Sequence, residues 1–423
     1  MGMISGIAAL GLGLVLGVQT EPSGERLYGI VLTAGGERLE GYLRWDRNET
    51  HWADFLDGRK EIPREHALEA ERLDAELRAR RERERSITLP DVRITWDEDD
   101  VSPPESSSSA IRFAHVRSLE VMDRRRVALT LHSGARVEFA SSSTDLGPSF
   151  RGLMVEDEIR GEVEVEWDDL ARVDFAVAPS GRAASTGPRL HGTVATESGL
   201  RLTGYVAWDL DETLPTDVLD GEQDGEDVRL AFADIAAIAR ESRSSARVTL
   251  VSGAEVVLDD SNDVDSGNRG IEITDPAFGR AIVGWDAFLS LEFHPASAAS
   301  HTGADAALYG RGDRLKGTVV AEDGRRVSGF IRWDNDEEYG WEVLDGRSEG
   351  VDFAIDFGRV RQIVRSGPDG ARVSLDDGST FALDGTTDVS EENRGIFVDP
   401  GAGETVLVRW RDFVSATFEE GSR

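Results

Sequence analysis

Three short acidic turns hold the side chains of this chain that are best suited to chemistry. Each turn follows a Trp-Asp pair, and the polar residues are Asp46, Asn48 and Glu49; Asp209, Asp211 and Glu212; and Asp334, Asp336 and Glu337. Hard cations such as calcium prefer several carboxylate and carbonyl oxygens together. An EF-hand loop also needs a glycine and a distal glutamate at fixed spacing, which these turns lack. We therefore expect turn-forming polar residues, with calcium binding as the alternative.

A second polar motif, Asp-x5-Arg-Gly, follows each turn at a distance. Its three copies contain Asp145 and Arg151, Asp263 and Arg269, and Asp388 and Arg394. An arginine fork and a carboxylate form a directional pair, so we expect the two residues of each copy to contact each other and brace the loop. An arginine that faces a ligand is the alternative. Further acids near Asp263 occur in the second copy alone, and we do not treat them as part of the motif.

The histidines argue against a catalytic centre. None of the seven recurs at a common repeat position; they are His51, His66, His115, His132, His191, His294 and His301. The sequence also lacks a Gly-x-Ser-x-Gly motif, a phosphate-binding loop and a His-Glu-x-x-His motif. Carboxylate pairs of the kind that cleave glycosides are too common in so acidic a chain to identify a site. We assign no catalytic, cofactor-binding or metal-binding residue, and we expect a non-enzyme that needs no cofactor.

The motifs belong to a block that is written three times. Its markers are Arg-Leu-x-Gly at 26, 189 and 314; Trp-Asp at 45, 208 and 333; Leu-Asp-Gly at 56, 219 and 344; Phe113, Phe232 and Phe357; Arg-Gly at 151, 269 and 394; and Trp167, Trp285 and Trp410, each followed eight residues later by a phenylalanine. The second and third copies are 125 residues apart throughout. The first and second are 163 apart early and 118 apart late, so about 44 extra residues interrupt the first copy. Such a repeat predicts tandem units.

Each copy alternates between apolar and polar residues in short segments that are separated by turn residues, which is typical of β-strands. In the third copy, Val327, Ile331 and Trp333 share one face of a strand. Each half of a copy reads as five short strands with one helical turn before the fifth. That order resembles small SH3-like barrels, including Sm-like and Tudor-like modules. We therefore expect an all-β protein of three units, each a pair of five-stranded SH3-like barrels, with one helical insertion.

The recurring tryptophans are expected in the core. Trp167, Trp285 and Trp410 end alternating strands, whereas the earlier set, at 45, 208 and 333, precedes the acidic turns. A stack that binds sugars or cations is the alternative interpretation.

The unit boundaries follow from the markers and from Pro- and Gly-rich stretches. We expect unit 1 at 26–178 with an insertion at about 63–109, a linker at 179–188, unit 2 at 189–294, a linker at 295–312 and unit 3 at 313–420. Within the insertion, Pro63 to Arg85 predicts a helix that is acidic at its start and arginine-rich at its end, as the helix dipole favours. Its apolar stripe of Ala70, Leu73 and Leu77 is narrow. We expect a solvated arm over unit 1, with docking of a partner as the alternative.

Composition limits the partners. The 423 residues contain 47 Lys and Arg against 81 Asp and Glu, a net charge of −34. Such a field repels nucleic acid and anionic membranes. Since there is no cysteine, disulfides, thiolate zinc sites and cysteine nucleophiles are excluded. A protein or a component of the cell envelope is the expected partner.

The beginning of the chain carries an apolar run from Ile4 to Val18, followed by polar residues. Its length suits the apolar part of a signal peptide better than a membrane span of about 20 residues, although no Lys or Arg precedes it. We expect residues 1–20 to be a signal peptide or a short anchor through residues 4–18. The sequence thus predicts an extracytoplasmic, non-catalytic repeat protein with a binding or structural role. A carboxylate-dependent hydrolase and a calcium-stabilised surface protein are the alternatives.

Overall fold

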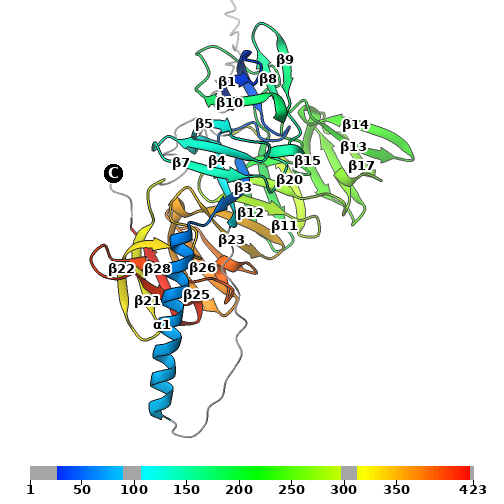
Figure 1. The fold of residues 1–423 in the computed structure, drawn as a ribbon. Coiled ribbons are helices and arrows are strands. Elements are labelled where there is room, and N and C mark those ends of the chain that lie inside the picture. The colour runs from blue at the N-terminus through cyan, green and yellow to red at the C-terminus, as the bar shows by residue number, and fades with distance from the viewer. Residues whose placement is uncertain (1–25, 89–105, 297–311, 420–423) are drawn as a thin grey trace, which may run out of the picture.

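A computed structural model describes residues 26–88, 106–296 and 312–419. The predicted leader at 1–20 lies outside these residues, as do most of the linker at 295–312 and residues 89–105 of the insertion. The described chain is all-β, as expected, with 52% of residues in strands, one α-helix and two large antiparallel sheets (Figure 1). No helix in the described part of the chain is both long and apolar enough to cross a membrane.

Each unit contributes ten strands to these sheets. Unit 1 contains β1 (Tyr28–Thr33), β2 (Arg38–Arg44), β3 (Phe55–Glu61), β4 (Ser106–Arg112), β5 (Val116–Val121), β6 (Arg126–Leu131), β7 (Arg136–Ala140), β8 (Leu153–Asp157), β9 (Gly161–Val165) and β10 (Leu170–Phe175), with helix α1 (Arg64–Thr88) between β3 and β4.

Units 2 and 3 repeat the series without a helix. Unit 2 contains β11 (His191–Thr196), β12 (Arg201–Ala207), β13 (Val218–Gln223), β14 (Glu226–Ala231), β15 (Ile235–Arg240), β16 (Ser245–Leu250), β17 (Glu255–Asp259), β18 (Ile271–Asp275), β19 (Gly279–Val283) and β20 (Phe288–Phe293). Unit 3 contains β21 (Lys316–Ala321), β22 (Arg326–Arg332), β23 (Val343–Ser348), β24 (Val351–Asp356), β25 (Val360–Gly367), β26 (Gly370–Leu375), β27 (Thr380–Asp384), β28 (Ile396–Asp399), β29 (Val406–Val408) and β30 (Phe413–Phe418).

The two halves of a unit interleave. In unit 1 the strand order is β9-β8-β2-β1-β10-β5-β6-β7-β3-β4, and equivalent pairings occur in units 2 and 3. The first strand therefore pairs with the last, and the third with the seventh. The expected pair of five-stranded barrels in each unit is not confirmed, because the halves exchange strands and no closed barrel is found among the described strands. A half of about 50 residues buries too little surface alone, so exchange of hairpins between halves gives both a larger core.

The repeated markers serve packing. Trp45, Trp208 and Trp333 are completely buried, and the later tryptophans are buried as well, which confirms the expected core positions. The expected one-turn helical links are also present, for example at Trp167–Asp169 and Trp410–Asp412. The glycine of Arg-Leu-x-Gly is required by close contact: a Cβ on Gly317 would lie 2.2 Å from the Thr417 carbonyl oxygen.

The units pack tightly against one another. Strand β19 of unit 2 pairs with β24 of unit 3, and one apolar core runs through both units. Arg112 of unit 1 is fully buried and pairs with Asp356 of unit 3 at 2.8 Å, while it also donates to the Asp275 carbonyl of unit 2 at 2.9 Å. This arginine therefore joins all three units at one point.

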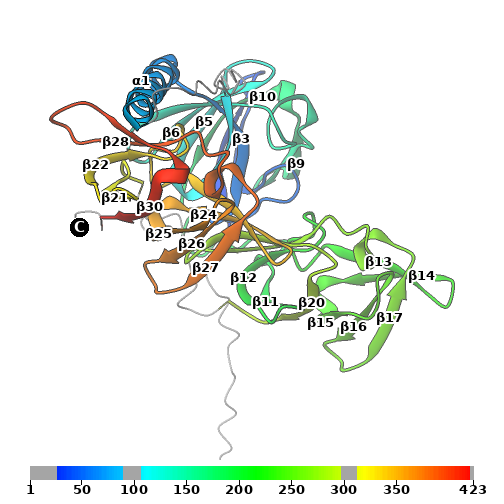
Figure 2. The same cartoon turned by 90° about the horizontal axis from the view of Figure 1, so that it is seen from below.

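Helix α1 does not lie over unit 1 as a solvated arm. It leaves unit 1 after β3 and runs along unit 3, beside β22 and β28 (Figures 1 and 2). Leu73 is buried there against Phe397 and Leu407. The narrow apolar stripe thus covers a neighbouring unit of the same chain.

Candidate binding surface

The acidic turns and the Arg-Gly motif form one brace in each unit. Asp209 has a left-handed backbone with φ of 48°, and its carboxylate accepts hydrogen bonds from the Arg269 backbone at 2.5 Å and from its Nε at 3.1 Å. Asp46 holds Arg151 in the same way at 2.6 and 3.0 Å. Asp334 holds Arg394 in unit 3. The arginine therefore braces the turn after the tryptophan.

The predicted pairing of this arginine with the aspartate six residues earlier is wrong. The carboxylates of Asp145, Asp263 and Asp388 instead accept hydrogen bonds from the backbone N–H groups of Asp57, Asp220 and Asp345 at 2.6, 2.8 and 2.7 Å. The backbone carbonyls of the same three residues accept the hydrogen bond of the buried tryptophan above them. The loop between this aspartate and the arginine reverses direction. The aspartate therefore contacts the third strand of its unit, whereas the arginine contacts the turn after the tryptophan.

Two groups of carboxyls come close together around these braces. They are Asp46, Glu49 and Asp145 in unit 1 and Asp209, Glu212 and Asp263 in unit 2, each with one oxygen per residue within 4.8 Å of the others. Burial, followed by the neighbouring acids, raises the pKa of Glu212 to about 9, and burial raises the pKa of Asp263 to about 6. The Oε2 of Glu49 is buried without a hydrogen-bond partner among the described residues. These carboxyls need protons or a cation to share the space.

A further recurring acid was missed in the sequence. Asp54, Asp217 and Glu342 each accept two backbone N–H groups of the preceding turn. Each also pairs with a basic residue of another unit: Arg189, Arg44 and Lys60, respectively. The available signal was an acid two residues before every Leu-Asp-Gly. These ion pairs fix the units to one another.

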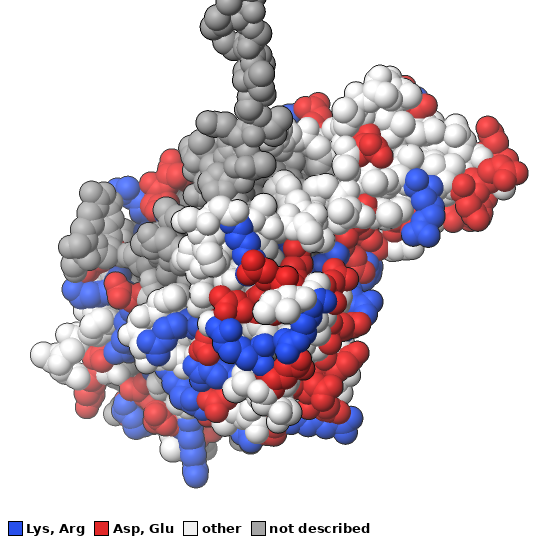
Figure 3. Space-filling view, turned by 90° about the horizontal axis from the view of Figure 1, so that it is seen from above, with Lys and Arg blue, Asp and Glu red and all other residues white. Residues whose placement is uncertain are grey.

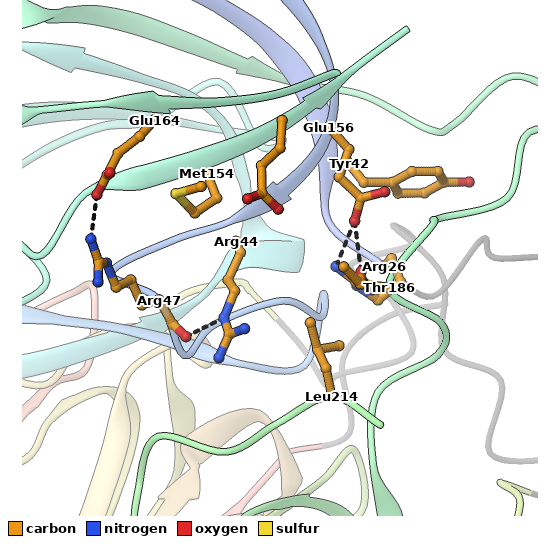
Figure 4. A pocket seen from close by; sticks show the side chains of 10 residues that line it. Arg26, Tyr42, Arg44, Arg47, Met154, Glu156, Glu164, Thr186 and Leu214 are labelled. Atoms are coloured by element: carbon orange, nitrogen blue, oxygen red, sulfur yellow. Dashed lines mark hydrogen bonds and ion pairs between the residues drawn. The ribbon is translucent and has the colours of Figure 1, made fainter. Parts of the chain in front are cut away.

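A hollow of about 400 Å³ lies where unit 1 meets unit 2 (Figure 4). It is lined by Arg26, Tyr42, Arg44, Arg47, Met154, Glu156, Glu162, Glu164, Thr186 and Leu214. We call it the junction pocket. Its floor is one face of β2, β8 and β9, since the pairing register aligns Tyr42 with Glu156 and Glu162, and Arg44 with Met154 and Glu164. The linker and unit 2 supply the wall.

Charge in the junction pocket is largely paired. Arg26 is buried and donates to Thr186 Oγ1 at 3.0 Å, with Glu156 3.7 Å away, and burial lowers the pKa of this arginine to about 10. Arg47 pairs with Glu164 at 2.5 Å on the exposed side. Burial raises the pKa of Glu156, but hydrogen bonds from Thr186 and Ser185 outweigh that effect and bring it below its ordinary value. Glu156 is thus held as a carboxylate.

The equivalent face of unit 3 is covered by α1. The hollow that remains there has about 320 Å³ and combines α1 residues with Arg314, Phe330, Arg332, Phe397, Asp399 and Thr405, the counterparts of Arg26, Tyr42, Arg44, Met154, Glu156 and Glu162. Glu69 of α1 pairs with Arg332 at 2.8 Å, and Asp74 pairs with Arg409. Leu73 packs on Phe397 between these ion pairs.

The equivalent face of unit 2 is covered by unit 1. Arg280 donates to both carboxylate oxygens of Asp57 at 2.6 and 2.9 Å. The ring of His51 lies 3.8 Å from that of Tyr205, and burial lowers the pKa of His51 well below its ordinary value. His191 is buried beside the same tyrosine, and burial lowers its pKa to about 4. Both histidines are therefore neutral packing residues.

The comparisons with known proteins identify no relative. No protein-family model matches the chain, and no curated protein matches it significantly.

On the face that Figure 3 shows, basic and acidic side chains are interspersed.

Proposed function

We propose that this chain is a non-catalytic repeat protein that serves as a binding scaffold at the cell envelope, outside the cytoplasm. The observation that carries this proposal is the brace of Asp209 and Arg269, which recurs in all three units. The recurring polar residues hold loops in place and do not converge on a reaction centre. An exported scaffold also agrees with the predicted leader at residues 1–20.

We further infer that each unit is a swapped pair of SH3-like modules. The strand set β10-β1-β2-β8-β9 and the set β5-β6-β7-β3-β4 have corresponding orders within one unit. Each set combines hairpins from both halves, which would give two small modules with a shared core. The junction pocket lies on the strand face of one such module.

Localisation and turnover test the proposal together. The full chain with a C-terminal reporter should be found outside the cytoplasm, and deletion of residues 1–20 should retain it inside in folded form. The purified chain should not hydrolyse a panel of glycosides and esters. Cytoplasmic retention of the full chain, or turnover that depends on a pocket carboxyl, would contradict the proposal.

The hydrolase alternative is not favoured by the junction pocket. A general acid needs a raised pKa so that it carries a proton at working pH. Glu156 has the opposite shift, and the Glu164 carboxylate is paired with Arg47.

A calcium-stabilised protein is the second candidate, because two units gather three carboxyls within 4.8 Å. Calcium binding at Asp46, Glu49 and Asp145 would raise the melting temperature of the full chain, and Glu49→Gln would reduce that rise. An identical melting temperature with calcium and with a chelator would remove this candidate.

A further inference from the structure

One three-strand face is built three times in this molecule, and its surroundings differ. On unit 3 it carries α1, and on unit 2 it carries the segment of unit 1 around Asp57. On unit 1, Thr186 of the linker and Asp217 of unit 2 contact Glu156 and Arg44 of this face, and the junction pocket remains beside them among the described residues. Unit 3 thus carries a helix where unit 1 keeps a hollow.

We propose that the junction pocket is the docking site for a basic amphipathic helix of a partner protein. The inference rests on the proposed binding function and names the class of partner. The chemistry of this partner follows from comparing unit 1 with unit 3 position by position.

The contact between α1 and unit 3 shows what such a face holds. Glu69 and Asp74 pair with Arg332 and Arg409, and Leu73 is buried between them on Phe397. A helix brings residues at i, i+3 and i+7 to one face, and Ala70 and Leu77 pack beside Leu73 there, so a short apolar stripe flanked by charges seats the helix.

Unit 1 keeps one of the two apolar contacts beneath Leu73 and reverses the charge at one end. Met154 stands where unit 3 has Phe397 and is a flexible apolar contact. Glu164 replaces Leu407, and Glu166 replaces Arg409; both glutamates are exposed. A matching helix therefore needs lysine or arginine where α1 carries Asp74.

The rim of the face favours such a helix over a second copy of this chain. Glu162, Glu164 and Glu166 form an exposed acidic row along β9 and the residue that follows it. The segment that covers unit 2 carries Asp54 and Asp57. Its counterparts in units 2 and 3 are also acidic, with Asp217 and Asp220 in one and Glu342 and Asp345 in the other. Since Arg44 of this face already pairs with Asp217 of the same chain, the acidic segment of a second copy would meet the glutamate row, which repels it.

Two labelled synthetic peptides test the proposal by fluorescence anisotropy with the full chain. The first has the sequence of residues 64–88, and the second carries D74K in that sequence. We expect the D74K peptide to bind at least tenfold more tightly than the first. Glu166→Arg should reverse this preference, and Met154→Lys should weaken binding of the D74K peptide at least tenfold. Glu138→Arg, an exposed change on β7, is the matched control and should leave binding unchanged.

Circular dichroism and melting temperature establish that each variant is folded. The proposal is overturned if neither peptide binds, or if binding of the D74K peptide does not respond to Glu166→Arg and Met154→Lys. It is also overturned if the chain self-associates and Met154→Lys makes it monomeric, since a second copy would then occupy the face. Failure of the proposed function would be seen in localisation and turnover, which do not depend on this pocket.

Discussion

The outer face of unit 1, formed by β2, β8 and β9, and the equivalent face of unit 3 have corresponding strands and register but different side chains. Unit 3 presents Phe397 and Leu407, and both are buried beneath α1. Unit 1 presents Met154 and Glu164 at the same positions, and among the described residues they line a hollow of about 400 Å³. These two differences, together with Glu166 in place of Arg409, distinguish the face that carries α1 from the face that keeps a hollow.

The comparison shows how a repeat can keep one fold and vary its contacts. The braces and buried tryptophans maintain the backbone in every unit, so the exposed positions of β2, β8 and β9 are free to differ. The side chains at these exposed positions then decide which segment or partner packs on each unit.

The largest expected effect concerns the point that fixes units 1 and 3 relative to each other. Arg112→Met should lower the free energy of unfolding by about 3–5 kcal/mol, because it leaves the carboxylate of Asp356 buried without its partner. Chemical denaturation measures this loss. Arg126→Met, which breaks the exposed pair with Asp123, is the control and should leave the stability nearly unchanged. Equal losses of stability from the two variants would show that the pair of Arg112 and Asp356 does not hold units 1 and 3 together.

The next effect concerns the covered face of unit 2. His191 has a pKa of about 4 in the folded chain and 6.5 as its ordinary value. Below pH 6.5 the unfolded chain takes up this proton first, so stability falls from pH 6.5 to 4 by up to about 3 kcal/mol from this residue. Above pH 6.5 the residue has no effect on the pH dependence.

His191→Tyr isolates this contribution, because unit 1 has Tyr28 at the same position. The difference in stability between variant and natural chain, measured by denaturation at pH 4.5 and pH 7.5, should favour the variant more at the lower pH. The buried carboxyls act in the opposite direction in both proteins and cancel from the difference. A difference that is constant with pH would refute the neutral, buried state of His191.

Leu73→Ala tests the covered face of unit 3 directly. It should weaken the docking of α1 by about 2–3 kcal/mol, since truncation of a buried leucine usually costs 2–5 kcal/mol and this site is at an interface. Hydrogen exchange in α1 reports the loss. Leu68 is 53% exposed on the same helix, and Leu68→Ala should leave exchange unchanged. Equal protection in both variants would mean that the apolar contact does not seat the helix.

The smallest effect concerns the braces. Arg394→Ala should cost about 1–2 kcal/mol and Arg269→Ala less, because the Arg394 side chain is 23% exposed and the Arg269 side chain 47%. A double-mutant cycle between Asp334 and Arg394 should show coupling, whereas one between Asp388 and Arg394 should be nearly additive. Coupling between Asp388 and Arg394, with additivity between Asp334 and Arg394, would instead support the pairing expected from the Asp-x5-Arg spacing.

Local patterns predicted much of the fold. Alternation, turn residues and the repeat gave the all-β class, and the ends of alternating strands located the buried tryptophans. The acidic start and basic end of residues 63–85 predicted α1 at nearly its observed bounds. These features depend on residues that are close in sequence.

Pairings between distant segments could not be predicted. Strand β1 pairs with β10 in unit 1, but its alternation would fit another partner equally well. The stripe around Leu73 does not specify whether unit 1, unit 3 or a partner covers it. Asp54 was missed because an acid before a strand usually contributes only to a turn, and its pairing with Arg189 requires two units to meet.

The central claim is that the residues at Met154, Glu164 and Glu166 decide whether this face of unit 1 can carry a helix as the face of unit 3 does. It is tested most directly by changing the unit 1 face to that of unit 3 with Met154→Phe, Glu164→Leu and Glu166→Arg together. The natural chain should not bind a labelled peptide of residues 64–88 measurably. The triple variant should bind one peptide per chain, because the tethered α1 keeps the unit 3 site occupied. A folded triple variant that still binds no peptide would contradict the claim.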